Sequence, residues 1–336
     1  MSIRETAAQV AALGAGAPVR MADALIAGIT RSALRAACDG GLLMRPAHGF
    51  IAPVNTVRDD ANAAFIARCR ALLDRRPHAV LSHWTAANIH RLPVAGRSSH
   101  TIHCTDSNPR SLPDVVAHRG VIPTSEVVEV DGLRVTSLLH TSVDIARSSP
   151  LPHALVTMDA ALRLRTIALN KEVGRPDHRR VEDRFAQDQA TAELQALAAH
   201  CAGRSGAKSA REAAWAASPL AESPAESWSR GHFLLAGIVP LGLQVRMVDA
   251  DGRERRLDFL LAEGLAGEVD GLVKYDGDGG AQRLRDEKTR DLLLERVGVR
   301  TLRWTGVEAF RDPADVVRMI GQAISLHRAA RTDRLR

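Results

Sequence analysis

Three carboxylates, Asp258, Glu268 and Asp270, have the type and spacing that suit a divalent cation. Asp258 stands between Leu257 and Phe259, and an Asp in such an apolar strand is costly to bury unless its charge is compensated. Glu268 and Asp270 are two residues apart, so on a strand both side chains point to one face. Mg²⁺ prefers oxygen ligands and binds through one or two carboxylates, water and a substrate phosphate. Such an ion, or Mn²⁺, lowers the pKa of its bound water and stabilises charge on a phosphate.

Two further side chains are candidates for the same chemistry. Glu226 falls in the first turn of a helix expected from Pro224 to Leu235, where the helix dipole favours a carboxylate. A catalytic Glu and an ordinary residue at a helix start fit this position equally well. Lys274, four residues after Asp270, is the candidate to orient the water or to neutralise transition-state charge, and a surface lysine is the alternative.

Short strands and two helices must position these residues. Residues 244–248 and 255–261 alternate around an Asp-Gly turn and predict a hairpin, in which Leu257, Phe259 and Leu261 share one face and Asp258 the other. A third strand carries Glu268, an amphipathic helix spans residues 282–297, and a last strand spans 299–304. The expected order is therefore αβββαβ.

This order of motifs resembles the DUF559 group of very-short-patch-repair-like proteins in the PD-(D/E)XK nuclease superfamily. The residues that carry the resemblance are Glu226, Asp258-Phe259, Glu268-Val269-Asp270-Gly271, Lys288, Arg290 and Leu302-Arg303-Trp304. It implies a restriction-endonuclease-like core over residues 222–330 that hydrolyses phosphodiester bonds with Mg²⁺ or Mn²⁺ at Asp258, Glu268 and Asp270. The chain departs from the pattern where the usual acid-x-Lys triplet ends in Asp270, where Leu257 replaces a proline, and where Lys274 replaces a common His.

Residues 1–56 predict a winged helix, with three helices followed by two short strands around Pro46-Ala47-His48. Thr30 is the expected N-cap of the third helix. In such a domain that helix enters the major groove of DNA and the wing contacts the backbone. The candidate DNA-binding residues are Arg31, Ser32 and Arg35 on the helix, and Arg45 and His48 on the wing. The alternative is a small helical domain whose arginines face solvent.

The N-terminal half resembles the AbiEi family, the DNA-binding antitoxins of type IV toxin-antitoxin systems. The supporting segments are residues 28–34, the wing from Gly41-Leu42 to Gly49-Phe50, residues 81–87 and residues 135–144. The resemblance implies autorepression on DNA, with a nucleotidyltransferase toxin as a partner. Residues 57–165 then form a mixed α/β middle domain, and residues 166–221 form a helical connector.

Composition supports an α+β multidomain protein, because 336 residues exceed one ordinary core and 45% of them are hydrophobic. The net charge is +6, and residues 222–336 carry 19 Lys and Arg against 19 Asp and Glu, so the basic excess lies upstream. No long apolar run or secretory signal is present, which predicts no membrane partner and a cytoplasmic location. Two functions follow: a DNA-binding endonuclease, or a DNA-binding regulator without catalysis. The sequence leaves the oligomeric state open.

Overall fold

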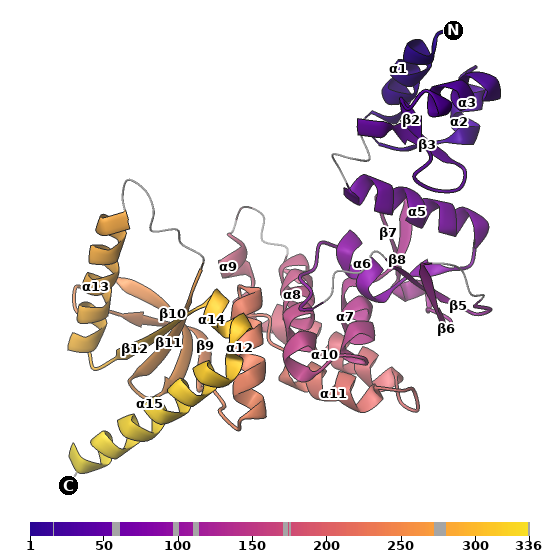
Figure 1. Ribbon diagram of the computed structural model, residues 1–336. Coiled ribbons are helices and arrows are strands. Elements are labelled where there is room, and N and C mark those ends of the chain that lie inside the picture. Colours follow the sequence, from indigo (N-terminus) through magenta and orange to yellow (C-terminus); the bar gives the residue numbers. More distant parts are fainter. Residues whose placement is uncertain are drawn as a thin grey trace. The chain divides into compact units, whose positions relative to one another are not determined.

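The computed structural model describes residues 1–15, 17–55, 61–96, 101–109, 114–170, 174, 176–271 and 280–334. The chain is an α+β protein with several sheets, as the sequence predicts (Figure 1). Its contacts divide it into two compact units: Met1–Ile89 with Ser99–Ser137, and His90–Ser98 with Leu138–Arg336. Within the described ranges, no helix has the length and apolarity needed to cross a lipid bilayer.

The first unit begins with the predicted order of helices followed by a hairpin. Its elements are α1 (Ile3–Gly14), β1 (Val19–Arg20), α2 (Met21–Ile26), α3 (Arg31–Asp39), β2 (Leu43–Met44) and β3 (Phe50–Pro53). Thr30 caps α3 as expected, since its Oγ1 accepts the Ala33 N–H. The sheet order is β1-β3-β2, and all pairs are antiparallel. The two-residue strand β1 is the one element here that the sequence analysis did not predict.

The rest of the first unit is a five-stranded mixed sheet with helices. Its elements are α5 (Ala61–Arg75), β4 (Val80–Leu81), α6 (His83–Ile89), β5 (Ile102–Asp106), β6 (Val115–Arg119), β7 (Val127–Val130) and β8 (Leu133–Thr136). The strand order is β6-β5-β4-β8-β7. Leu72, Leu81 and Val135 lie in the core between α5 and this sheet. Beside it, Trp84 lies next to His103, with ring centroids 4.9 Å apart.

The second unit starts with helices that the sequence analysis assigned partly to the middle domain. They are α7 (Leu138–Ala146), α8 (Leu151–Leu169), α9 (Asp177–Arg180), α10 (Arg184–His200) and α11 (Ala207–Ala216). The contact-based boundary lies after Ser137, whereas the predicted boundary lies after residue 165. The difference arises because α7 and α8 pack against each other, against α10 and against α11. Small alanines such as Ala190, Ala210 and Ala213 are fully buried in these helices.

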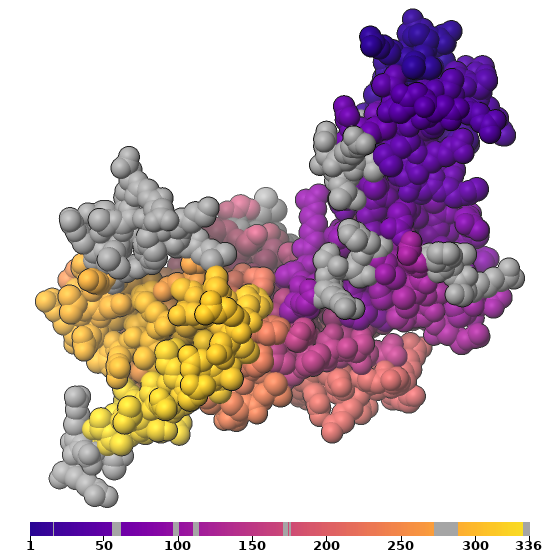
Figure 2. Space-filling model, in the orientation of Figure 1, coloured from indigo at the N-terminus to yellow at the C-terminus, as the bar shows by residue number. Residues whose placement is uncertain are grey.

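The C-terminal part has the predicted αβββαβ order followed by two more helices. Its elements are α12 (Pro224–Leu235), β9 (Gly242–Val248), β10 (Glu254–Ala262), β11 (Leu265–Asp270), α13 (Gly280–Arg296), β12 (Arg300–Thr305), α14 (Gly306–Arg311) and α15 (Pro313–Arg334). The strand order is β12-β11-β10-β9, with β11 and β12 parallel and the other pairs antiparallel. The helix α13 covers one face of the sheet, and α12, α14 and α15 cover the other (Figure 1). In the space-filling view, α14 and α15 form the yellow surface over this core (Figure 2).

The helix α12, which carries Glu226, is held firmly against α8. Arg230 donates to both carboxylate oxygens of Asp159, at 2.8 and 2.6 Å, and both side chains are buried. One residue later, Gly231 lies so close to α8 that a Cβ there would be 2.5 Å from the Cα of Pro152. The backbones of α8 and α12 approach closely because Gly231 has no Cβ and because the buried charge of Arg230 is paired with that of Asp159. Glu226 is therefore placed by α8 as well as by its own domain.

Candidate functional site

The candidate site lies where β10 and β11 separate. Their antiparallel register runs from Ala262↔Leu265 to Phe259↔Gly267. Beyond it, the Val269 N–H donates to Asp258 Oδ2 over 2.9 Å. β11 itself remains paired with β12 through Asp270 and Thr305. The Asp258 carboxylate thus occupies the gap between two strands, at the end of β11 that carries Glu268 and Asp270.

Glu226 reaches the same gap from α12. Ser223 caps this helix and Pro224 is its first residue, so Glu226 is in the first turn as the sequence predicts. The side-chain amide of Gln244 on β9 donates to Glu226 Oε2 at 3.0 Å and to Asp258 Oδ1 at 3.1 Å. A single NH₂ group therefore bridges two carboxylates. The Glu222 N–H donates a further bond to Glu226 Oε2 at 2.9 Å.

Glu268 and Asp270 lie on the same face of β11, which confirms the expected alternation. Arg303 on β12 bonds both of them, at 2.9 Å from Glu268 Oε2 and 2.9 Å from Asp270 Oδ1. Arg290 on α13 donates to Glu268 Oε1 at 2.6 Å and to the backbone carbonyl of Arg256. Asp291 is also bound to Arg303, at 2.9 Å. These two carboxylates are thus neutralised by arginines.

Burial changes the acidity of the site. It raises the pKa of Glu226 to about 7, and the nearby charge of Asp258 adds to the rise. Burial also raises the pKa of Asp258 and of Glu268, although the Val269 N–H opposes this at Asp258 and Arg290 opposes it at Glu268. The pKa of Arg303 is raised because Asp291, Glu268 and Asp270 outweigh the opposing effect of burial. Three carboxyls in one site therefore resist ionisation.

Two hollows adjoin these side chains and share Val269, Asp270 and Gly271. One, of about 470 Å³, is mainly polar and includes Asp258, Glu268, Arg290 and Arg303 in its lining. The other, of about 720 Å³, is mainly apolar. Glu226, Val307 and Phe310 line it. The carboxylates can consequently be reached from solvent.

The proposed metal ligands come together less tightly than the sequence predicts. In the described part of the chain, no group of three or more His, Cys, Asp or Glu side chains is arranged to hold a metal ion. Asp258 is bridged to Glu226, whereas Glu268 and Asp270 are joined through Arg303. Lys274 lies outside the described residues.

The expected alternation on β10 is wrong at one position. Phe259 and Leu261 share a core cluster with Trp304, but Leu257 packs with Leu294 of α13 in another cluster. The change occurs opposite Gln244 on the neighbouring strand β9, between the pairs Leu257↔Val245 and Phe259↔Leu243. Gln244 has a φ of 50°, which departs from extended backbone. An irregular residue breaks the period of two that the prediction assumes.

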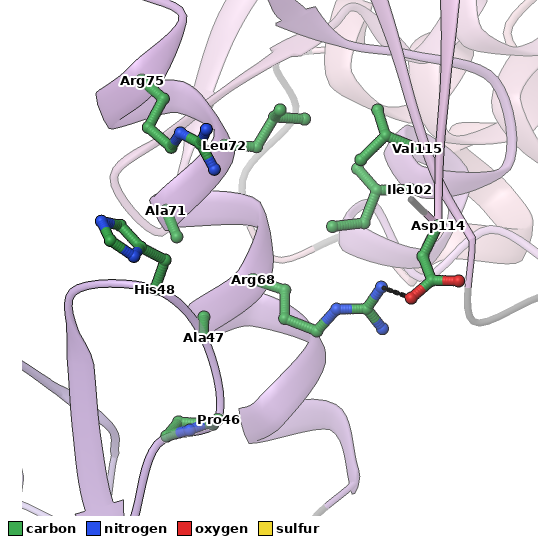
Figure 3. A pocket seen from close by; sticks show the side chains of 10 residues that line it. All are labelled: Pro46, Ala47, His48, Arg68, Ala71, Leu72, Arg75, Ile102, Asp114 and Val115. Carbon is green, nitrogen blue, oxygen red and sulfur yellow. Dashed lines mark ion pairs between the residues drawn. The ribbon is translucent and has the colours of Figure 1, made fainter. Parts of the chain in front are cut away.

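Candidate DNA-binding residues lie on the surface of the first unit. The exposed ones on α3 are Arg31, Ser32 and Arg35, and those on the loop between β2 and β3 are Arg45 and His48. A hollow of about 230 Å³ separates this loop from α5 and contains His48, Arg68 and Arg75 (Figure 3). Arg68 also pairs with Asp114 at 3.5 Å. Basic side chains from the wing and from α5 therefore flank one groove.

Sequence reasoning missed two side chains of the candidate site. Gln244 was taken only as the start of a strand, and Arg303 only as part of a family motif. A signal was available at both positions, because each is a polar residue between two apolar neighbours, like Asp258. Lys288 is exposed on α13, and Arg290 bonds Glu268 in preference to the adjacent Asp291 of its own helix.

Comparisons with known proteins place the chain among mycobacterial relatives. No family model matches the sequence. Over 261 residues the chain is 30% identical to the uncharacterized protein MT2308 of Mycobacterium tuberculosis, covering 75% of this chain and 84% of the relative. The same values hold for the uncharacterized protein Rv2248 of strain H37Rv. The crystal structure of the RV2827C protein from Mycobacterium tuberculosis has a TM-score of 0.37 and 18% identity, and the match covers 72% of this chain and 88% of that one. Given the identity to MT2308 and the length it spans, the chain belongs to the family of MT2308 and Rv2248.

Proposed function

We propose that this is a DNA-binding protein whose C-terminal domain is an endonuclease that hydrolyses phosphodiester bonds with Mg²⁺ or Mn²⁺. The observation that carries the proposal is the bridge from Gln244 that joins Glu226 to Asp258 at the gap between β10 and β11, beside Glu268 on β11. Burial raises the pKa of each of these three carboxyls. Buried carboxyls of this kind cluster at functional sites, where a charged ligand compensates them. The resemblance to DUF559 and PD-(D/E)XK nucleases gives the same reaction class.

The donor set fits a hard cation. Glu226 and Asp258 supply carboxylate oxygens. Their carboxylates accept hydrogen bonds from the backbone N–H groups of Glu222 and Val269 and from the side-chain amide of Gln244, all of them uncharged donors. A bound Mg²⁺ would supply a water of lowered pKa and a counter-charge for the phosphate. Arg290 and Arg303 hold Glu268 and line the polar hollow, where their charge favours the approach of a phosphate.

DNA binding is assigned to the first unit. Arg31, Ser32 and Arg35 occupy the exposed surface of α3, the helix that enters the major groove in a winged helix. Arg45 and His48 occupy the wing position. The basic excess of the chain lies entirely before residue 222, upstream of the carboxylates, and the first unit contributes 13 Lys and Arg against 11 Asp and Glu to it.

The test is the nicking of supercoiled and mismatched DNA in Mg²⁺, Mn²⁺ or EDTA. The wild-type protein should cleave only with a divalent cation. Asp258→Ala and Glu268→Ala should each lower the rate by at least about 100-fold, because each removes a carboxylate from the site. Glu295→Gln, an exposed position on α13, is the matched control and should retain the wild-type rate.

Cleavage that survives in the double variant Asp258→Ala/Glu268→Ala would come from a contaminant and would remove the endonuclease from consideration. The same holds if the wild-type protein gives no product with either cation. Circular dichroism of each variant shows whether lost activity reflects lost folding.

One observation favours a second candidate, a DNA-binding regulator or antitoxin without catalysis. Glu268 and Asp270 are both paired with Arg303, so half of the acidic cluster is neutral without a cation. In that reading the nuclease-like domain acts as a binding platform, and an adjacent nucleotidyltransferase toxin would be the partner. A toxin gene beside this one, together with DNA binding that needs no divalent cation, would support the regulator.

A further inference from the structure

Gln244 has an unusual backbone for its place in the fold. It lies within β9 between two residues that pair with β10, Leu243↔Phe259 and Val245↔Leu257, yet its φ is 50°. Residues with a side chain rarely adopt this left-handed conformation, and strained positions cluster where a side chain is needed in a particular orientation. The conformation accompanies a side chain that reaches both Glu226 and Asp258.

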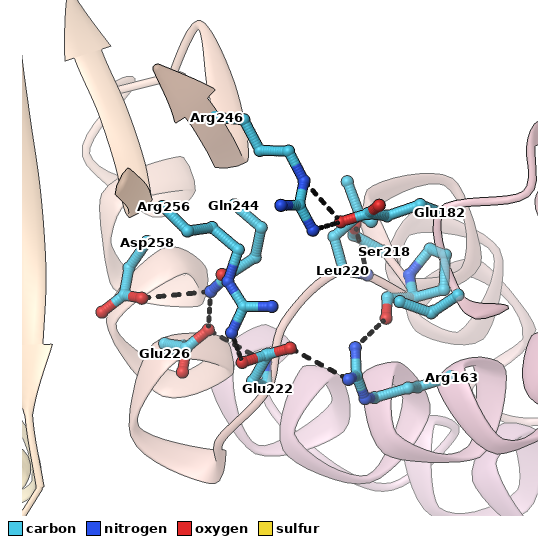
Figure 4. A network of polar contacts seen from close by, with 12 residues as sticks. Arg163, Glu182, Ser218, Leu220, Glu222, Glu226, Gln244, Arg246, Arg256 and Asp258 are labelled. Atoms are coloured by element: carbon cyan, nitrogen blue, oxygen red, sulfur yellow. Dashed lines mark hydrogen bonds and ion pairs between the residues drawn. The ribbon is translucent and has the colours of Figure 1, made fainter. Parts of the chain in front are cut away.

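The two polar atoms of the Gln244 amide differ in their hydrogen bonding. Its Nε2 donates to Glu226 Oε2 and to Asp258 Oδ1, which uses both hydrogens of the NH₂ group. Its Oε1 is buried and has no hydrogen-bond partner. An unsatisfied buried acceptor is costly, so a ligand that pairs with Oε1 would be favoured. Figure 4 shows the amide between the two carboxylates.

We propose that Gln244 is a positioning residue of the cation site, which holds Glu226 and Asp258 together without a cation and turns its Oε1 toward the cation when one binds. A half-turn about the Cγ–Cδ bond exchanges the places of Nε2 and Oε1. The oxygen would then lie where the NH₂ group bridged the two carboxylates, so that Glu226, Asp258 and Gln244 would together hold the cation. This inference rests on the proposed function, because it requires that the site binds a divalent cation.

The position of Gln244 depends on α8 as well as on the sheet. Glu226 accepts the N–H of Glu222, and the Glu222 carboxylate is bound by Arg256 on β10 and by Arg163 on α8 (Figure 4). The contacts form a continuous chain from α8 to Asp258. The two carboxylates that the amide bridges are therefore held in place before any cation arrives.

The test measures Mn²⁺ binding to the full-length protein by titration calorimetry between pH 5.5 and 8.5. Gln244→Met keeps the size of the side chain but removes both donor and oxygen. It should weaken binding at least about tenfold and move the pH midpoint of binding upward by roughly one unit, because the carboxylates lose a charge-stabilising hydrogen bond. Gln244→Glu replaces the NH₂ donor with a second oxygen and adds a negative charge when ionised, so binding should recover at pH 8.5 and fall steeply below it. Gln322→Met, at an exposed position on α15, is the control.

The outcomes separate this inference from the function on which it rests. If wild type and Gln244→Met bind Mn²⁺ with equal affinity and equal pH midpoint while Glu226→Gln binds weakly, Gln244 has no positioning role and the cation site stands. If the wild-type protein binds no Mn²⁺ at any pH, both are overturned. If Gln244→Met does not fold, Gln244→Glu decides: its binding must reach that of the wild type at pH 8.5 and fall more steeply than the wild type's as the pH is lowered, and a pH dependence equal to that of the wild type overturns the proposal.

Discussion

At the scale of single residues, Glu226 makes stability depend on pH in the direction opposite to that of a paired carboxylate. Its pKa is about 7 in the folded protein and near 4.5 as the ordinary value. Between these values the unfolded chain has lost the proton while the folded protein keeps it, so the free energy of unfolding falls as pH rises. Above pH 7 the decrease in the free energy of unfolding caused by Glu226 is complete.

Glu226→Gln should therefore lose less stability than the wild type between pH 5 and pH 8. The expected difference in the free energy of unfolding is about 1–3 kcal/mol, and the glutamine can still accept the Glu222 N–H. Urea unfolding at the two pH values measures it, with Glu295→Gln as an exposed control. Equal pH dependence in Glu226→Gln and wild type would show that this carboxyl ionises normally.

At the scale of elements, the contact between α8 and α12 holds the candidate site in place. Gly231→Ala puts a Cβ 2.5 Å from the Cα of Pro152, a backbone atom that cannot move without shifting the helix. The expected cost is about 1–3 kcal/mol of unfolding free energy, from overpacking. Urea denaturation followed by circular dichroism measures the change.

Gly321 in α15 provides the matched control. A Cβ there would meet Ile238 at 3.9 Å, an ordinary contact, so Gly321→Ala should stabilise by about 0.5–1 kcal/mol through higher helix propensity. Gly231→Ala and Gly321→Ala make the same chemical change within a helix. Destabilisation of similar size in both would mean that the approach of α12 to α8 is not the cause.

At the scale of the whole molecule, the basic excess before residue 222 predicts where salt acts on DNA binding. Replacing Arg31 and Arg35 with alanine should weaken binding and reduce the slope of log K against log salt by up to about 1.8, or ~0.9 for each phosphate that the variant no longer neutralises. Fluorescence anisotropy with a labelled duplex at several salt concentrations measures this slope. Arg211, exposed on α11, is the control position. An unchanged slope in the Arg31/Arg35 variant would place the DNA-binding surface elsewhere.

The sequence predicted elements better than it predicted their grouping. Alternation and turn residues located β9, β10 and β11, and Pro224 marked the start of α12, because these signals are local. The boundary after Ser137 depends on which helices α8 contacts, and apolar spacing along one helix does not show its partner. β1 was missed because two residues are too few for a repeating pattern.

The site was predictable only in part for the same reason. Asp258 was found because a carboxylate in an apolar strand needs an explanation, and Glu268 because it shares one strand face with Asp270. The bridge from Gln244 was not predicted, because it depends on a left-handed φ at Gln244. The spacing of residues in a sequence does not indicate such a conformation in a residue other than glycine. Arg303 bonds two of the expected metal ligands, a pairing across parallel strands that sequence distance conceals.

The distribution of tryptophans makes the two units separately observable. Trp84 is in the first unit, while Trp215, Trp228 and Trp304 are in the second. Trp304 is buried against Phe233 and Phe259, so its emission follows the integrity of the C-terminal core. After a single Trp84→Phe substitution, all remaining tryptophans lie in the second unit. The emission that is lost with Trp84 comes from the first unit. Intrinsic fluorescence can thus show in which order the two units melt, without an added label.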